Sequence, residues 1–173
     1  MKIKIIQGDI TIQPVEAIVN AANNGLYGGA GVDGAIHRAA GPRLSEYCRL
    51  IREKQGGCKT GDAVITPPGN IGVKYIIHAV GPVWSGGNRS EVELLKSAYN
   101  NSLSLAGQYE LRSIAFPNIS TGVYGFPKQL AAESVAELID SYKKNPNSVE
   151  SIFFVCYDQE NYDIYKKIIY TET

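Results

Sequence analysis

Short apolar runs alternate with longer segments of helical periodicity along most of this chain. Strands are predicted at residues 3–6, 17–19, 63–66, 75–80, 113–116 and 151–156. Helices are predicted at residues 34–40, 44–54, 92–106, 130–142 and 162–169. Strands that alternate with helices of this length predict an α/β fold, with a mostly parallel sheet covered on both faces. The length of 173 residues fits one domain over residues 1–173.

Several local signals indicate where the helices begin and end. Gly56-Gly57 and Asn145-Pro146 each follow a helical pattern and predict its end. Ser90 and Glu93 have the spacing of a capping box, in which each side chain bonds a free backbone N–H at the start of the next helix.

The charge balance limits the possible partners. The chain has 17 Lys and Arg against 17 Asp and Glu, so no large positive field exists to hold duplex DNA, although a local basic patch is still possible.

The three cysteines of the chain match no zinc spacing and are expected to be reduced, buried thiols. No signal-peptide pattern and no apolar run of about 18 residues is present, which favours a cytoplasmic protein.

Three loops at predicted strand ends have unusual compositions. They are residues 8–11, residues 20–34 and residues 117–127. In an open parallel sheet, ligands bind outside the carboxyl ends of the strands. Closely spaced glycines let backbone N–H groups point at a ligand, and successive N–H groups form an anion site. Two such loops at one sheet edge suit a diphosphate, even in a chain without net charge.

The second loop contains a G-x-G-x-x-G pattern at Gly29, Gly31 and Gly34. Alone, this pattern is weak evidence for a dinucleotide site. A Rossmann site needs a tight turn directly after the strand and an acidic residue at the next strand end. Here several polar residues precede the first glycine, and Glu53 lies in a predicted helix. An NAD-dependent dehydrogenase site is therefore not expected.

Four motifs together resemble the signature loops of macrodomains. They are GDI at 8–10, NAAN at 20–23, GGAGVDGAIHRAAG at 28–41 and ISTGVYG at 119–125. The chain resembles the MacroD-type hydrolases in particular, in order and spacing over residues 2–170. The resemblance implies a three-layer α/β/α fold with a central mixed, mostly parallel sheet. It also implies hydrolysis of esters on the distal ribose of ADP-ribose, namely deacetylation of O-acetyl-ADP-ribose and removal of mono-ADP-ribose from Asp or Glu of proteins.

The resemblance assigns roles residue by residue. Asp33 is the expected catalytic acid–base group, and Asn23 is expected to orient the distal ribose. Asp9 and the Ile10 backbone are expected at adenine, with Tyr157 stacked on its ring. The remaining expected ligand-binding residues, which mostly surround the diphosphate, are Asn20, Gly29, Ala30, Gly31, Val32, Ser120, Thr121, Gly122, Val123 and Tyr124. No metal and no cofactor is implied, and the expected state is a monomer.

Each assignment has a structural alternative. Asp33 is also suited to be the N-cap of a helix that begins at Gly34. Asn20 and Asn23 could be loop residues that bond their own backbone, and Asp9 could be a turn residue. His37 and His78 fall in a predicted helix and strand rather than in a glycine loop, so both are expected to be structural.

The chain departs from the family pattern at two positions of the second loop. Ala30 interrupts the glycine run and Tyr27 stands at its rim, and these changes are expected to affect substrate choice more than hydrolysis.

Three other functions stay open. A non-catalytic ADP-ribose reader is possible, but a reader does not need a carboxylate at Asp33. An ADP-ribose 1″-phosphate phosphatase would use the same pocket. A single-stranded RNA or poly(A) binder is disfavoured by the lack of excess positive charge.

Overall fold

The computed structural model describes residues 1–169 and contains every predicted strand and helix, with ends that move by a few residues. The strands are β1 (Lys2–Gln7), β2 (Ala17–Ala21), β3 (Ala63–Thr66), β4 (Tyr75–Ala79), β5 (Ser113–Phe116) and β6 (Ser151–Cys156). The helices are α1 (Gly31–Ala40), α2 (Pro42–Gln55), α3 (Glu91–Gln108), α4 (Lys128–Lys144) and α5 (Gln159–Ile168), with a short 3₁₀ helix η1 (Ile10–Ile12).

The six strands form one mixed sheet in the order β1-β6-β5-β2-β4-β3. All neighbours are parallel except β3, which is antiparallel to β4 at one edge. The central strands are apolar on both faces, as parallel strands covered on both sides must be. The predicted α/β fold with a mixed, mostly parallel sheet is confirmed.

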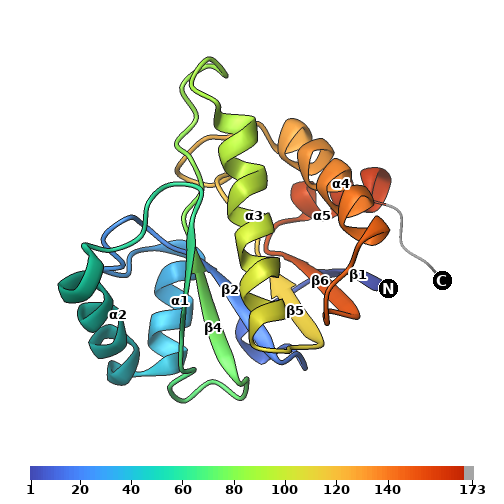
Figure 1. Cartoon of the computed structure of the whole chain (residues 1–173). Helices are drawn as coiled ribbons and strands as arrows, with labels where there is room; N and C mark the ends of the chain where they lie inside the picture. The colour runs from blue at the N-terminus through green and yellow to red at the C-terminus, as the bar shows by residue number, and fades with distance from the viewer. Residues whose placement is uncertain (170–173) are drawn as a thin grey trace.

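Helices cover both faces of the sheet and divide the core in two (Figure 1). On one face, α1 and α2 pack over a cluster that includes Ile18 of β2 and Ile76 of β4. On the other face, α3, α4 and α5 pack over a second cluster that includes Val19 and Ile77. Successive residues of a strand point to opposite faces, so the next residue pair, Asn20 and His78, returns to the α1 side.

Helix α1 begins earlier than the sequence predicts. Its first residue is Gly31 rather than Gly34, and its N-cap, Ala30, has no side-chain cap. Asp33 therefore lies inside the first turn, and its interpretation as an N-cap is wrong. The sequence does not indicate this helix start because the first residue, Gly31, is a poor helix former.

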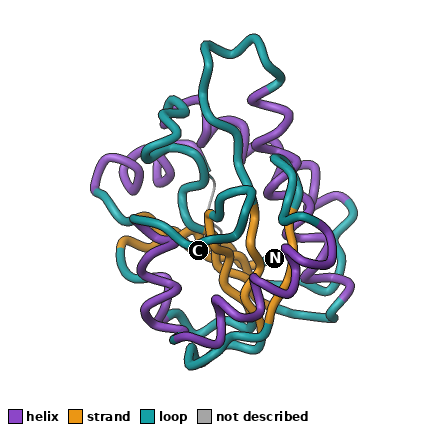
Figure 2. The backbone as a smooth tube through the Cα atoms, turned by 90° about the vertical axis from the view of Figure 1, so that its left-hand side faces the viewer, coloured by secondary structure: helices purple, strands orange, loops and turns teal. Residues whose placement is uncertain are grey.

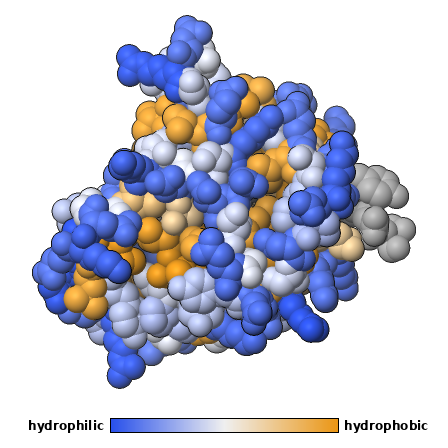
Figure 3. Space-filling view, in the orientation of Figure 1, coloured by the Kyte–Doolittle hydropathy of each residue, from blue (hydrophilic) through white to orange (hydrophobic). Residues whose placement is uncertain are grey.

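The predicted capping box at α3 is also wrong. Ser90 has a left-handed backbone (φ 59°) and makes no side-chain cap bond. Instead the buried carboxylate of Glu91 accepts hydrogen bonds from the N–H groups of Ser85, Gly87 and Arg89. These bonds, that of Ser85 first, hold the pKa of Glu91 below its ordinary value. They stabilise the loop of residues 81–90, whose hydrophilic tip projects at the top of the molecule (Figures 1 and 3).

The three cysteines are free and buried, as predicted. Burial raises the pKa of each thiol to about 11, so none is a ready nucleophile near neutral pH. Within residues 1–169, no helix is long and apolar enough to cross a membrane, and no cluster of three or more metal-binding side chains occurs.

Candidate active site

Five loops gather at the carboxyl edge of the parallel strands, because β1, β2, β4, β5 and β6 run in the same direction. Figure 2 shows loops collected at the end of the molecule from which the 81–90 loop projects. Backbone bonds join the loops to their neighbours, for example Ala22 N–H to Ala79 O at 3.0 Å and Trp84 N–H to Tyr124 O at 2.8 Å. The glycine-rich loops of the sequence are therefore parts of one surface.

Apolar side chains are unusually exposed around this edge. Of the seven large hydrophobic residues that stand exposed among the described residues, five lie in these loops, one after each parallel strand. They are Ile12, Tyr27, Val83, Val123 and Tyr157. Val123 is 97% exposed and Tyr157 is 89% exposed. A ring of exposed apolar residues around polar backbone is typical of a ligand-binding site.

The loop between β2 and α1 is closed by Asn23. Its Nδ2 donates to Gly28 O at 2.8 Å, and its Oδ1 accepts from Tyr27 N–H at 3.1 Å. Each amide atom keeps capacity for one more hydrogen bond. Asn23 therefore fits the loop-turn alternative and still has groups available for a ribose hydroxyl.

Arg52 of α2 supports the same loop from outside. Its Nη1 donates to the carbonyls of Gly25 and Leu26, and its guanidinium lies 4.3 Å from the ring centroid of Tyr27. Sequence reasoning missed Arg52, because its position on an amphipathic helix gives no signal of a contact with a distant loop.

The glycine segment then passes directly over the start of α1. A Cβ on Gly34 would lie 2.4 Å from Gly29 O, so no other residue fits there without moving the loop. A Cβ on Gly29 would lie 3.4 Å from Asp33 Oδ2. This oxygen of Asp33 is therefore next to the glycine segment.

Asp33 is buried and held by two side chains through its other oxygen. Asn20 Nδ2 donates to Asp33 Oδ1 at 2.8 Å, and His37 Nε2 lies 3.4 Å from the same atom. Burial raises the pKa of Asp33, and the Asn20 bond and the His37 charge reduce that increase. A carboxyl whose pKa is raised accepts a proton more readily than an ordinary aspartate, which suits a general base.

The structure also places His37, which was expected to be structural, and Asn20, which was expected to bind the ligand. His37 lies against Asp33, and the Asp-to-His spacing of four residues on one helix is a signal that could have found it. Asn20 is fully buried with its amide directed to Asp33, rather than in the open part of the loop.

Two stretches of backbone present N–H groups without acceptors in the described chain. They are residues 28–33, which include the first turn of α1, and residues 121–124 in the loop after β5. The second loop is folded by Phe126 N–H, which donates to the carbonyl of Ser120 at 2.9 Å. Ser120 has φ 69° and its Oγ is buried without a partner in the described chain. Free N–H groups at a helix start and in a tight loop are suited to anions.

The loops after β1 and β6 carry the residues expected at adenine. Asp9 Oδ1 accepts from both the N–H and the Oγ1 of Thr11, which makes Asp9 the N-cap of η1. Both bonds use Oδ1, so Oδ2 stays available. Gly8 N–H donates to Cys156 O at 3.1 Å and brings this loop beside Tyr157.

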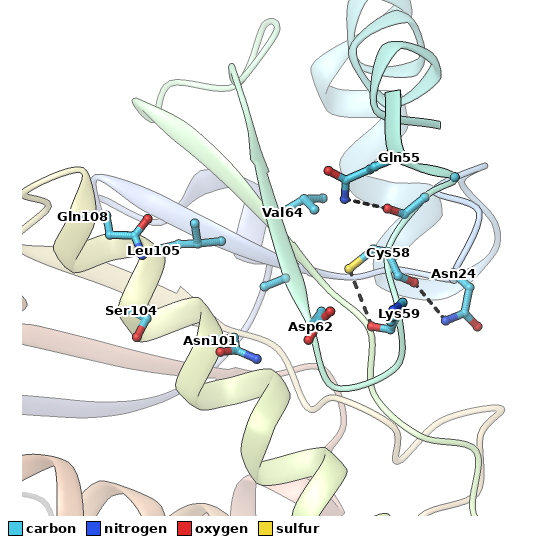
Figure 4. A pocket seen from close by; sticks show the side chains of 13 residues that line it. Asn24, Gln55, Cys58, Lys59, Asp62, Val64, Asn101, Ser104, Leu105 and Gln108 are labelled. Carbon is cyan, nitrogen blue, oxygen red and sulfur yellow. Dashed lines mark hydrogen bonds between the residues drawn. The ribbon is translucent and has the colours of Figure 1, made fainter. Parts of the chain in front are cut away.

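A cavity of about 720 Å³ lies elsewhere, between the end of α2, the edge strand β3 and α3 (Figure 4). Among its lining residues, only Asn24 belongs to the glycine-rich loops. Its amide donates hydrogen bonds to Cys58 O and Thr60 Oγ1. None of the predicted site residues lines this cavity, so we place the candidate site at the strand ends.

The chain is similar to known proteins over almost its whole length. An O-acetyl-ADP-ribose deacetylase of Salmonella typhimurium is 54% identical over 168 residues, which cover 97% of this chain and 94% of that protein. A Macro domain-containing protein of Cupriavidus necator is 54% identical over 166 residues, or 95% of each chain.

Solved structures give the same result. The macrodomain of Oceanobacillus iheyensis with ADP has a TM-score of 0.89 and 41% identity, with 94% of this chain and 87% of that chain covered. The macrodomain of Trypanosoma brucei in complex with ADP-ribose has a TM-score of 0.86 and 36% identity, with 96% and 68% covered. The family model described as "Macro domain" matches residues 19–135, which is more than half of the chain. With this match and close relatives over almost its whole length, the chain belongs to the macrodomain family.

Proposed function

We propose that this protein binds ADP-ribose and hydrolyses esters on its distal ribose. The observation that carries the proposal is the buried Asp33, whose Oδ1 is held by Asn20 while its Oδ2 lies beside the glycine segment. A protein that only binds ADP-ribose gains nothing from this buried carboxylate, which costs stability. Several curated relatives that are 52–54% identical to this chain are named O-acetyl-ADP-ribose deacetylase, which supports the same activity.

The two sets of free N–H groups are proposed to hold the diphosphate. Residues 28–33 and 121–124 supply backbone dipoles, so no lysine or arginine is needed at this point. Val123 and Tyr124 then cover the ligand from the outside. Asp9 Oδ2 accepts from the adenine amino group, and Tyr157 stacks on the adenine ring. Asn23 holds the distal ribose, which supplies orientation rather than proton transfer.

Asp33 acts on the attacking water in this mechanism. The water oxygen forms a bond to the ester carbonyl carbon, and Oδ2 of Asp33 takes the proton that the water loses. The bond between the carbonyl carbon and the ribose oxygen breaks, and the ribose oxygen takes the proton back from Asp33 and leaves as a hydroxyl. Attack at the anomeric carbon instead would use the same water and the same base. The diphosphate can help to orient this water.

Two substrate classes follow, O-acetyl-ADP-ribose and proteins that carry mono-ADP-ribose on Asp or Glu. Both contain an ester on the distal ribose, so one pocket suits both. All the groups named above come from a single chain and lie at the edge of one sheet. We therefore infer that the protein acts as a monomer of one domain.

The proposal is tested by calorimetry with ADP-ribose and NAD, followed by turnover of O-acetyl-ADP-ribose and of a glutamyl-linked ADP-ribosylated protein. We expect ADP-ribose to bind much more tightly than NAD, because the nicotinamide of NAD occupies the space where the distal pocket closes. We also expect both esters to be hydrolysed. Binding without hydrolysis would favour the reader function, and equal affinity for NAD would exclude the proposed pocket.

A further inference from the structure

Two fully buried polar residues lie side by side at the ends of neighbouring strands. Asn20 of β2 and His78 of β4 are paired in register, and neither side chain reaches solvent. Both face α1, because Ile18 and Ile76, two residues earlier, pack in the cluster on the α1 side. Buried polar groups in an apolar layer are costly unless hydrogen-bonded. The placement of these two residues therefore requires a reason beyond packing.

The hydrogen bonds of this pair determine where its protons lie. Asn20 Nδ2 is 2.8 Å from Asp33 Oδ1 and 3.1 Å from His78 Nδ1. The ionised carboxylate of Asp33 only accepts, so the NH₂ end of the Asn20 amide must face it. The second hydrogen of that NH₂ group is then directed to His78 Nδ1, which must act as an acceptor.

His78 is therefore neutral, with its proton on Nε2. That proton is donated to Thr66 Oγ1 at 2.9 Å, on the edge strand β3. Burial lowers the pKa of His78 to about 3, so the ring stays neutral throughout the range in which the protein is expected to work. A chain of bonds then runs from Thr66 through His78 and Asn20 to Asp33, across three neighbouring strands into α1.

We propose that His78, held as its neutral Nε2–H tautomer between Asn20 and Thr66, is a positioning residue that holds the Asn20 amide toward Asp33. The inference rests on the proposed function, since the position of Asp33 matters only if Asp33 acts on a reacting water. The opposite tautomer would place a ring N–H against the Asn20 NH₂ group. Asn20 would then turn away and release Oδ1 of Asp33, which would free the carboxylate to rotate and displace Oδ2 from the glycine segment.

Thr66 provides the sharpest test because it is remote from the ligand loops. It is buried on β3, and substitution there touches neither diphosphate loop nor Asn23. Thr66→Val keeps the shape of the side chain but removes the acceptor for Nε2–H, whereas Thr66→Ser keeps the hydroxyl. We expect Thr66→Val to lower kcat for O-acetyl-ADP-ribose on the order of 10-fold, with KM and ADP-ribose Kd changed less than about 2-fold. Thr66→Ser should stay close to the unsubstituted protein.

A second pair of variants acts at His78 itself. His78→Asn presents an amide oxygen near the position of Nδ1 and can still accept from Asn20, whereas His78→Leu cannot. We expect His78→Asn to retain more kcat than His78→Leu. Melting temperatures of both proteins are compared, so that a difference in folding is separated from a difference in turnover.

Imidazole ¹⁵N NMR gives a readout that does not depend on activity. The chain contains two histidines, so the His37→Gln variant assigns the signals of His78. We expect His78 to be the neutral Nε2–H tautomer, and Thr66→Val to shift the Nε2 resonance because the hydrogen bond at this nitrogen is lost. An Nδ1–H tautomer in the unsubstituted protein, or normal kcat in folded Thr66→Val and His78→Leu, would overturn the positioning role. Absence of ester hydrolysis in the unsubstituted protein would instead overturn the proposed function.

Discussion

His37 Nε2 lies 3.4 Å from Asp33 Oδ1, one turn further along α1. Asn20 approaches the same oxygen from the sheet, so helix and sheet both hold one side of the carboxylate. The other oxygen is next to Gly29. Asp33 is thus oriented by one oxygen and available through the other, which is the arrangement required of a fixed general base.

Asp33→Asn should separate binding from turnover. The amide keeps an oxygen that can accept from Asn20, but it cannot take a proton from water. We expect turnover of O-acetyl-ADP-ribose to fall about 10²–10⁴-fold, the usual contribution of general acid–base catalysis. ADP-ribose affinity, measured by calorimetry, should change little because backbone N–H groups hold the diphosphate. Asp33→Ser should be folded and equally inactive; full activity in it would leave the enzyme without its proposed base.

The pH dependence should report the buried state of Asp33. Because burial raises the pKa of Asp33, kcat should decrease on the acid side of its pH profile with an apparent pKa above the ordinary aspartate value of about 3.9. This acid limb of the profile reports protonation of Asp33. His37 opposes this increase, so His37→Gln should move the limb to higher pH. A limb at the ordinary value, or one that does not respond to His37→Gln, would contradict the assignment of Asp33 as the base.

The same raised pKa has a consequence for stability. The folded state binds the Asp33 proton more tightly than the unfolded state, so stability falls as the pH rises from the unfolded pKa through the folded pKa. Above both values, the charged carboxylate is unfavourable to folding. Asp33→Asn should therefore raise the melting temperature at about pH 7 and much less at about pH 3. Equal shifts at both pH values would show that charge burial is not the cause.

Gly34 should be required for both binding and turnover. Gly34→Ala places a Cβ 2.4 Å from Gly29 O, within the distance at which the backbone must move. The displaced segment carries the free N–H groups proposed for the diphosphate, so ADP-ribose Kd should rise together with the loss of kcat. Gly72→Ala is the matched control, because its Cβ meets nothing within 4 Å. Unchanged ADP-ribose affinity in Gly34→Ala would place the diphosphate elsewhere.

The fold could be predicted from sequence because its signals are local. The alternation of apolar runs with helical periodicity, and breakers such as Gly56, are sufficient to place the strands and helices. The start of α1 was mispredicted because Gly31 and Gly34 both disfavour helix, while packing against the glycine loop stabilises the turn that contains them. Tertiary contacts thus override propensity at the functional loop.

The contacts between residues of the candidate site could be predicted only in part. The motifs indicated which loops carry the site and singled out Asp33. The contact of Asn20 with His78 depends on the pairing register of β2 with β4, which residues far apart in the chain determine together. Arg52 reaches the carbonyl of Gly25 in the same way, through tertiary structure alone. Polar residues inside apolar strands were nevertheless a usable signal, since burial obliges them to find partners.

Asp9 allows adenine recognition to be separated from its turn role. Oδ1 caps η1 through Thr11, and Oδ2 is the oxygen proposed to accept from the adenine amino group. Asp9→Asn can keep the oxygen that caps η1 while replacing the other acceptor by a donor. Asp9→Ala loses both. We expect either substitution to weaken ADP-ribose binding by about 1–3 kcal/mol, as for the loss of a hydrogen bond to a charged group.

Stability distinguishes the two roles of Asp9. Asp9→Ala should lower the melting temperature because the cap is lost, whereas Asp9→Asn should not. An inosine diphosphate ribose ligand, which has a carbonyl in place of the adenine amino group, provides the complementary measurement. The unsubstituted protein should bind it more weakly than ADP-ribose, and Asp9→Asn, with a donor in place of the acceptor, should reduce that preference. If Asp9→Asn binds ADP-ribose as tightly as the unsubstituted protein, Asp9 acts only as the cap of η1, and adenine is recognised by other groups.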